Sequence, residues 1–168
     1  MNNATSVADA RGRGLGSAML LAPVILVAHF LEEAPQFVDW FNAHVARGIT
    51  PAPFWTVNFT ALAITLAVVA LEWLTRTAAS AILVVAWFGF LFFANAFLHI
   101  VATLADGAYM AGLGTAVLLY LPFYAWVAAR ILRTRRLSPG VTAVSAILGA
   151  IPMLLHGYLI IFRGSRLF

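Results

Sequence analysis

Residues 78–105 read AASAILVVAWFGFLFFANAFLHIVATLA, a run of 28 residues without one charged side chain. A helix needs about 20 mostly apolar residues to cross the roughly 30 Å hydrocarbon core of a bilayer, so this run can cross at a tilt. Apolar stretches of this length are typical of transmembrane helices and not of soluble domains. The segment therefore predicts an integral membrane protein.

The composition of the whole chain agrees with this interpretation. Of its 168 residues, 63% are apolar and 10% are charged, whereas soluble domains are about half apolar and a quarter charged. Four further apolar stretches flank the first, at residues 16–33, 54–74, 109–132 and 141–162. They predict an all-α, polytopic membrane bundle of about five transmembrane helices, which forms a single domain over residues 16–168 after a disordered tail at residues 1–15.

A short amphipathic segment lies between the first two apolar stretches. In residues 36–48, the apolar side chains of Phe37, Trp40 and Phe41 recur at helical spacing among polar residues, and Pro51 ends the pattern. Such a pattern predicts one amphipathic helix lying in the membrane interface. At that place it would be able to gate the entry of a substrate from the membrane.

Arginine supplies all the basic charge, because the chain has a net charge of +4 and contains no lysine. With five crossings, the side of the N-terminus holds Arg11, Arg13, Arg76, Arg130, Arg133, Arg135 and Arg136, and the other side holds Arg47, Arg163 and Arg166. Positively charged loops stay in the cytoplasm, so we expect a cytoplasmic N-terminus. Arginine clustered in this way marks loops of a membrane protein, and we exclude nucleic acid as a partner. The lack of cysteine excludes disulfides and thiolate metal sites.

The few strongly polar side chains in or beside the apolar stretches are His29, Glu32, Glu33, Asn58, Asn95, His99, His156 and Tyr158. At 1.5 Å per helical residue, the three histidines and Asn58 would lie roughly 6–9 Å below the outer membrane surface. Polar groups inside a membrane are costly and commonly functional. We therefore expect one polar site in the outer half of the bundle. By contrast, Glu72 and Arg76 are four residues apart at the opposite side, which predicts a structural ion pair.

Spacing within the helices indicates what this site binds. Glu32 and Glu33 follow His29 by three and four residues, and His99 follows Asn95 by four, so each set can share a helix face. Imidazole and carboxylate ligands without sulfur suit zinc, iron or manganese. We predict a divalent metal, zinc or iron, with the ligands His29, Glu32, His99 and His156.

The remaining polar residues would carry the chemistry of a hydrolase. Glu33 is assigned as the general base that takes a proton from a metal-activated water. The side chains assigned to orient a carbonyl or phosphoryl oxygen of the substrate are Asn95, Asn58 and Tyr158. The substrate would be a membrane lipid or another small amphiphile that enters laterally near the outer leaflet. Tyr109, Tyr120 and Tyr124 are interpreted as packing or interfacial residues.

Three other functions fit the same residues. Two histidines on different helices are able to act as axial ligands of a haem, although the paired glutamates then have no role. A proton-coupled transporter would use the glutamates and histidines as a proton relay, which should continue into the inner half of the membrane. In a purely structural subunit, the histidines would only form hydrogen bonds between helices.

The segment His29-Phe-Leu-Glu32-Glu33 matches the pattern that names the HXXEE family of small bacterial integral membrane proteins, and the chain resembles that family from its first to its last span. Asn95-Ala-Phe-Leu-His99 and His156-Gly-Tyr158 are similar to later polar motifs of the family. The resemblance implies a membrane enzyme without a settled substrate, located in a bacterial inner (plasma) membrane. The site is also similar to those of CAAX-processing metalloproteases and ceramidase-like hydrolases, but the arginine expected after the paired glutamates of the former is missing here.

Overall fold

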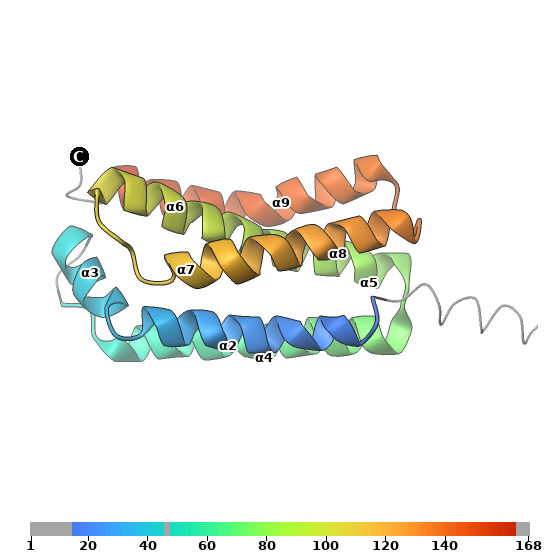
Figure 1. Ribbon diagram of the computed structural model, residues 1–168, viewed down its shortest axis with the longest axis horizontal. Coiled ribbons are helices and arrows are strands. Elements are labelled where there is room, and N and C mark those ends of the chain that lie inside the picture. The colour runs from blue at the N-terminus through green and yellow to red at the C-terminus, as the bar shows by residue number, and fades with distance from the viewer. Residues whose placement is uncertain (1–14, 46–47, 164–168) are drawn as a thin grey trace, which may run out of the picture.

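The computed structural model describes residues 15–45 and 48–163, so the predicted N-terminal tail lies outside the described residues except for Leu15. Within the described ranges the protein is helical and contains no strand (Figure 1). The elements are η1 (Ser17–Leu20), α2 (Leu21–Glu33), α3 (Phe37–His44), α4 (Pro51–Thr75), α5 (Ala78–Phe88), η2 (Gly89–Ala94), α6 (Asn95–Asp106), α7 (Leu113–Thr115), η3 (Ala116–Tyr120), α8 (Leu121–Arg133), α9 (Pro139–Tyr158) and η4 (Leu159–Arg163). Here η1 is a 3-10 helix, and η2, η3 and η4 are π-helical segments.

Several of these elements join end to end into long rods. Four rods are long and apolar enough to cross a membrane: Pro51–Thr75, Ala78–Asp106, Leu113–Arg133 and Pro139–Ile161. A fifth, Ser17–Glu33, qualifies only together with α3, from which it is bent by 59°. The prediction of an all-α membrane bundle of about five crossing helices is thus confirmed, with four or five candidate spans in the described part of the chain.

The fourth rod begins later than the sequence predicted. It was expected from residue 109, but residues 107–112 form a loop and the helix begins at Leu113. The cause is local, because Gly107 and Gly112 have φ angles of 68° and 92°, in the left-handed region that favours glycine. The resulting loop passes over the end of α2, where the predicted site residues lie.

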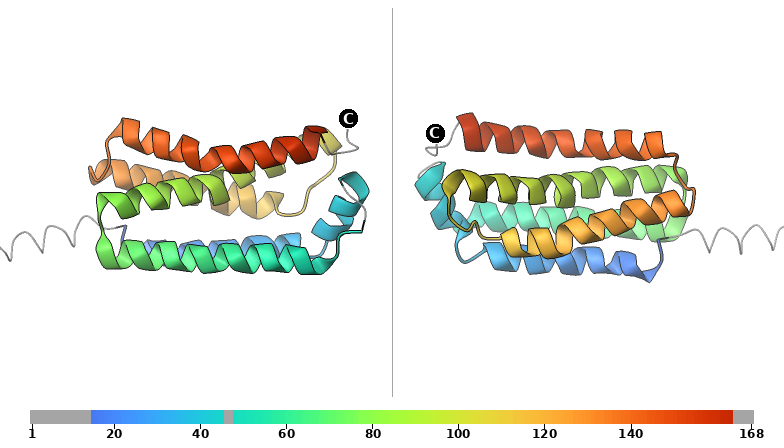
Figure 2. Two further views of the ribbon diagram at one scale, coloured as in Figure 1. Left: turned by 180° about the vertical axis from the view of Figure 1, so that it is seen from behind. Right: turned by 45° about the horizontal axis from the view of Figure 1, so that its top comes forward.

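The rods run antiparallel and place their connections at two ends (Figures 1 and 2). One end holds α3, the loop of residues 107–112 and the end of the described chain, and we refer to it as the α3 end. The other end holds the turns between α4 and α5 and between α8 and α9, together with five arginines; we refer to it as the arginine end. The residues of the arginine end are Arg76, Arg130, Arg133, Arg135 and Arg136.

The predicted amphipathic helix exists as α3 and is tied to the end of α6. The indole N–H of Trp40 donates to Asp106 Oδ2 at 3.1 Å, and His44 Nε2 lies 3.2 Å from Asp106 Oδ1. These contacts hold α3 across the α3 end of the bundle, beside the loop that follows Asp106 (Figure 2).

The ion pair expected between Glu72 and Arg76 does not form. Glu72 is buried and instead binds the guanidinium of Arg136, which follows α8, and accepts a hydrogen bond from Ser80 at 2.7 Å. Arg76 adopts a left-handed conformation that ends α4, and its guanidinium lies 5.9 Å from the ring of Trp73. The buried pair therefore joins the α4–α5 turn to the segment after α8, which a pattern of local spacing does not reveal.

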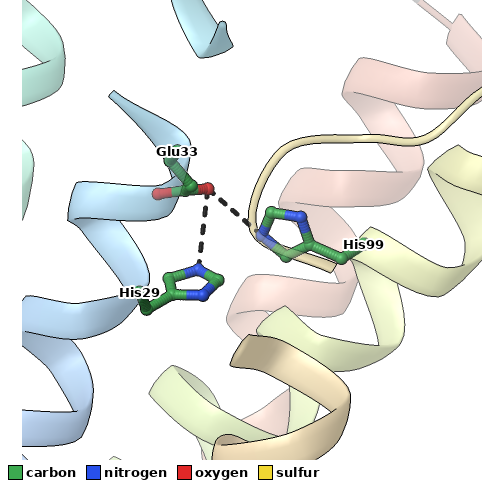
Figure 3. Close-up of side chains that lie close together, drawn as sticks. All are labelled: His29, Glu33 and His99. Carbon is green, nitrogen blue, oxygen red and sulfur yellow. Dashed lines mark ion pairs between the residues drawn. The ribbon is translucent and has the colours of Figure 1, made fainter. Parts of the chain in front are cut away.

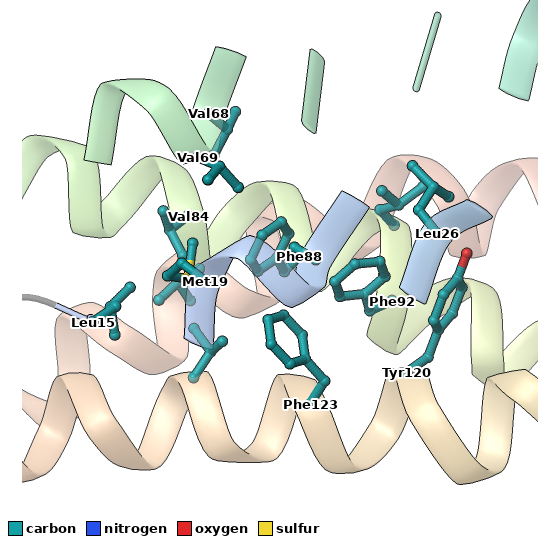
Figure 4. Close-up of a cluster of buried hydrophobic side chains, with 14 of the residues drawn as sticks. Leu15, Met19, Leu26, Val68, Val69, Val84, Phe88, Phe92, Tyr120 and Phe123 are labelled. Carbon is teal, nitrogen blue, oxygen red and sulfur yellow. The ribbon is translucent and has the colours of Figure 1, made fainter. Parts of the chain in front are cut away.

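A row of stacked aromatic side chains fills the centre of the bundle (Figure 4). The rings of Phe88 and Phe92 are 4.7 Å apart, and Phe92 lies 4.5 Å from the ring of Tyr120. Tyr120 is fully buried and in turn lies 4.2 Å from the ring of His29. The apolar core thus packs directly against the polar site through the contact between Tyr120 and His29.

Candidate metal centre

Three buried side chains from two helices converge near the α3 end (Figure 3). Glu33 Oε1 lies 3.1 Å from His99 Nε2 and 3.6 Å from His29 Nε2. One nitrogen or oxygen of each residue lies within 4.8 Å of the others, which makes the group a candidate metal site. The sequence prediction therefore identified three residues that the fold does bring together, although it gave Glu33 the role of base.

Helical geometry explains this convergence. His29 and Glu33 are one helical turn apart on α2, so both side chains project from the same face. His99 is on α6, and its ring meets that of His29 edge to face with centroids 4.9 Å apart. The exposed fractions of His29, Glu33 and His99 are 0%, 6% and 2%, so the group is shielded from both lipid and water.

A hydrogen bond orients the ring of His29. Its Nδ1 lies 2.8 Å from the hydroxyl oxygen of Thr115, and that hydroxyl donates to the carbonyl of Gly112 at 3.3 Å. In the tautomer in which Nδ1–H of His29 donates to the Thr115 oxygen, the lone pair of this imidazole is on Nε2. That lone pair faces Glu33 Oε1, an arrangement that a cation between the two atoms would relieve.

Glu33 has no conventional countercharge in its surroundings. Its only ion-pair partners in the described part of the chain are the two imidazoles, and the arginines with described side chains lie at the other end of the bundle. A buried carboxylate without a positive partner is costly, so either a proton or a metal ion must balance it. The cluster is electrostatically complete only with such a cation.

The loop of residues 107–112 closes the site. A Cβ atom on Gly112 would lie 2.7 Å from His99 Cε1, 2.8 Å from Glu33 Cγ and 2.9 Å from His29 Cε1. Only a residue without a side chain can therefore pass so close to all three. The backbone at Gly112 forms the cover over the cluster.

The carboxylate of Glu32 binds the start of the Leu113–Arg133 rod and not the predicted metal site. It was expected to bind metal, but its carboxylate accepts hydrogen bonds from the backbone N–H of Gly114 at 3.1 Å and of Thr115 at 2.8 Å. It also accepts one from the hydroxyl of Tyr109, which raises the pKa of Tyr109 above its ordinary value. Glu32 thus caps the N-terminal end of the Leu113–Arg133 rod and anchors the loop over the cluster.

Of the other predicted residues, Asn95 lies beside the cluster. The amide nitrogen of Asn95 lies 3.4 Å from His29 Nε2, beside the cluster. Asn58 donates to the carbonyl of Phe54, one turn earlier in α4, at 3.0 Å. His156, predicted as a ligand, is exposed on α9 and is not among the three clustered residues, and Tyr158 is exposed on the same helix.

Tyr120, Thr115 and Gly112 belong to the site although the sequence did not single them out for it. The hydroxyl of Tyr120 is buried and has no hydrogen-bond partner among the described residues. Two π-helical segments, η2 and η3, adjoin the site just before Asn95 and just after Thr115. π-Helical segments are rare in proteins, but those that occur are frequently at functional sites. Their positions cannot be read from residue spacing.

Comparison with known proteins establishes the family of the chain. No curated protein and no solved structure matches the chain. A family model described as "Protein of unknown function with HXXEE motif" matches residues 20–127, which is more than half of the chain and includes every residue of the buried cluster. The chain therefore belongs to the HXXEE family, as the motif at His29, Glu32 and Glu33 indicated.

Proposed function

We propose that this protein is a metal-dependent membrane enzyme, a hydrolase, whose metal is held by His29, Glu33 and His99. The observation that carries the proposal is the convergence of two imidazole nitrogens on one buried carboxylate oxygen. Two histidines and one glutamate, with a fourth position left for water or substrate, form a common ligand set of catalytic zinc sites.

The two distances from the carboxylate oxygen to the imidazole nitrogens fit this ligand set. Zinc binds histidine nitrogen at about 2.0–2.1 Å and carboxylate oxygen at about 2.0–2.2 Å, so its ligand atoms lie roughly 3–4 Å apart in a tetrahedron. Glu33 Oε1 lies at 3.1 Å and 3.6 Å from the two imidazole nitrogens. Thr115 supplies the partner that a metal-binding histidine needs on its other nitrogen.

The groups around the cluster support hydrolysis. When bound, the metal supplies Lewis-acid activation of a water molecule. The second carboxylate oxygen of Glu33, which pairs with neither histidine, is available to take the proton. The amide of Asn95 and the unpartnered hydroxyl of Tyr120 can donate hydrogen bonds to a carbonyl or phosphoryl oxygen of the substrate.

The position of the cluster among apolar rods favours a lipid or another amphiphile as the substrate. Access requires the loop of residues 107–112 to move away, because a Cβ atom on Gly112 would already lie within 3 Å of all three members of the cluster. The hydrogen bond of Tyr109 to Glu32 holds that loop closed, and Tyr109 is 57% exposed. A substrate headgroup at the membrane surface would therefore meet Tyr109 first.

Metal analysis of the full-length protein, purified in detergent and loaded with zinc, tests this proposal. The wild type should retain about one zinc ion per chain, and His29→Ala or His99→Ala should lose it. His156→Ala is the matched control, since it removes an exposed histidine of a membrane rod and should keep the metal. Equal zinc content in all variants would refute the metal site, and a haem absorption spectrum of the purified protein would favour the electron-transfer alternative.

The proposal also places the chain in a bacterial inner membrane with its N-terminus in the cytoplasm. The five arginines with described side chains all lie at the arginine end, which supports a cytoplasmic location of that end. The lack of cysteine allows a clean test with single cysteines at exposed positions of the two ends. In intact cells, a membrane-impermeant maleimide should label Ala108→Cys but not Gly140→Cys; the reverse labelling would invert the topology.

A further inference from the structure

A groove at the arginine end, far from the metal cluster, has the chemistry of a lipid headgroup site. It has a volume of about 520 Å³ and is lined by α8 and the start of the first rod. The lining residues are Leu15, Gly16, Ser17, Ala18, Ala125, Trp126, Ala129, Arg130 and Arg133. Binding sites for small molecules have volumes of about 300–1,000 Å³, so a headgroup fits.

The divergence of two rods creates the groove. At the α3 end, α2 packs against α7 and η3, whereas α8 rises away from α2 toward the arginine end (Figure 1). The aromatic core under this divergence is closed by Phe123, which is buried, and Trp126 stacks on it with ring centroids 5.8 Å apart. The groove therefore lies between the start of the first rod and α8, beside this aromatic pair.

The two arginines of the groove have no side-chain partner within the described part of the protein. Neither Arg130 nor Arg133 forms an ion pair or a side-chain hydrogen bond within residues 15–45 and 48–163. Arg136 differs from them, because Glu72 neutralises it. Two arginines about one helical turn apart thus line a groove whose other residues are small or apolar, apart from Ser17.

We propose that this groove binds the phosphate of an anionic phospholipid. Guanidinium groups bind phosphate oxygens in pairs, and basic pockets between membrane helices commonly hold anionic headgroups. Trp126 is an aromatic residue of the kind that lies at headgroup level, and the alanines with Leu15 offer an apolar wall to the first acyl carbons. The site does not depend on the metal or on catalysis at the opposite end.

Native mass spectrometry of the full-length protein in detergent tests the site with phosphatidylglycerol against phosphatidylcholine. The wild type should retain phosphatidylglycerol preferentially, and Arg130→Gln with Arg133→Gln should reduce that preference about fivefold for each arginine removed. Arg76→Gln with Arg135→Gln is the matched control, because it removes two charges from the same end outside the groove. An equal loss in the control would overturn the proposal in favour of general charge attraction.

A second measurement uses the wild type and so does not depend on the folding of the arginine variants. Phosphatidylglycerol with brominated acyl chains should quench tryptophan fluorescence more than brominated phosphatidylcholine, and Trp126→Phe should abolish the difference. Inorganic phosphate that competes as well as the lipid would show a site for free anions and overturn the proposal. Lipid preference that appears only after deletion of residues 1–14 would identify that segment as the occupant and also overturn it.

Discussion

Replacing Gly112 by alanine tests how closely the loop covers the cluster. A residue other than glycine at a left-handed φ costs roughly 1–2 kcal/mol. The new Cβ would also lie under 3 Å from carbon atoms of His29, Glu33 and His99, and such overpacking costs about 1–3 kcal/mol more. The expected loss of about 2–5 kcal/mol corresponds to a lower Tm by roughly 4–20 °C for a chain of this length.

Gly107→Ala separates the two contributions. Gly107 has a similar φ of 68°, but nothing lies within 4 Å of a Cβ built there. It should therefore lose only the backbone contribution, about 2–8 °C in Tm. Thermal unfolding of both variants in one detergent measures the difference, and zinc content should fall in Gly112→Ala alone. Equal losses of stability in the two variants would refute the close contact between the loop and the cluster.

Two further predictions concern the ion pair and the loop. Arg136→Ala should destabilise the protein by about 3–5 kcal/mol because it leaves Glu72 buried and unpaired, whereas Arg76→Ala should cost under about 1 kcal/mol; similar Tm values for the two would contradict the observed pairing. The hydrogen bond to Glu32 raises the pKa of Tyr109 in the folded state, so its contribution to stability is complete below about pH 10 and is lost as the pH rises through the higher folded pKa. In Glu32→Gln, ultraviolet difference titration against Tyr109→Phe should show this pKa returning toward its ordinary value; an unchanged pKa would mean that Glu32 does not hold the loop.

Length and hydropathy were sufficient to predict the rods, because crossing a bilayer imposes a minimum apolar length that few other structures need. The fixed rise of each helical residue also led us to expect the histidines at one depth, and of these His29 and His99 do meet. His29, Glu33 and His99 meet because they share both a depth and a direction. For residues on different rods, the sequence indicates only their position along the helix axis, not the direction in which their side chains point.

The direction in which a rod turns its side chains was not predictable for α9. Its outward face is as apolar as a buried one, because Val144, Ile147, Leu148 and Ile151 on that face are all exposed, so apolar periodicity does not indicate which side of α9 packs against the bundle. His156 is exposed on this helix and does not join the cluster. Which of Glu32 and Glu33 joins the cluster likewise depends on where the Leu113–Arg133 rod begins. The left-handed φ angle of Gly112 determines that start.

The pairing of Glu72 with Arg136 shows a limit of local spacing. Residues four apart on a helix can pair, and Glu72 and Arg76 satisfy that condition in the sequence. In the structure, Arg76 ends the helix in a left-handed conformation, and a residue 64 positions from Glu72 takes its place. Contacts of this kind depend on how turns meet at one end of a bundle.

The most direct test of the metal centre compares Glu33→Gln with Glu32→Gln in a zinc titration of the purified protein. Both variants remove one carboxylate charge from adjacent positions of α2, but only Glu33 lies between the two histidines. We predict that Glu33→Gln loses high-affinity zinc binding, while Glu32→Gln binds zinc as the wild type does and is less stable. Zinc binding that survives in Glu33→Gln and disappears in Glu32→Gln would contradict the assignment.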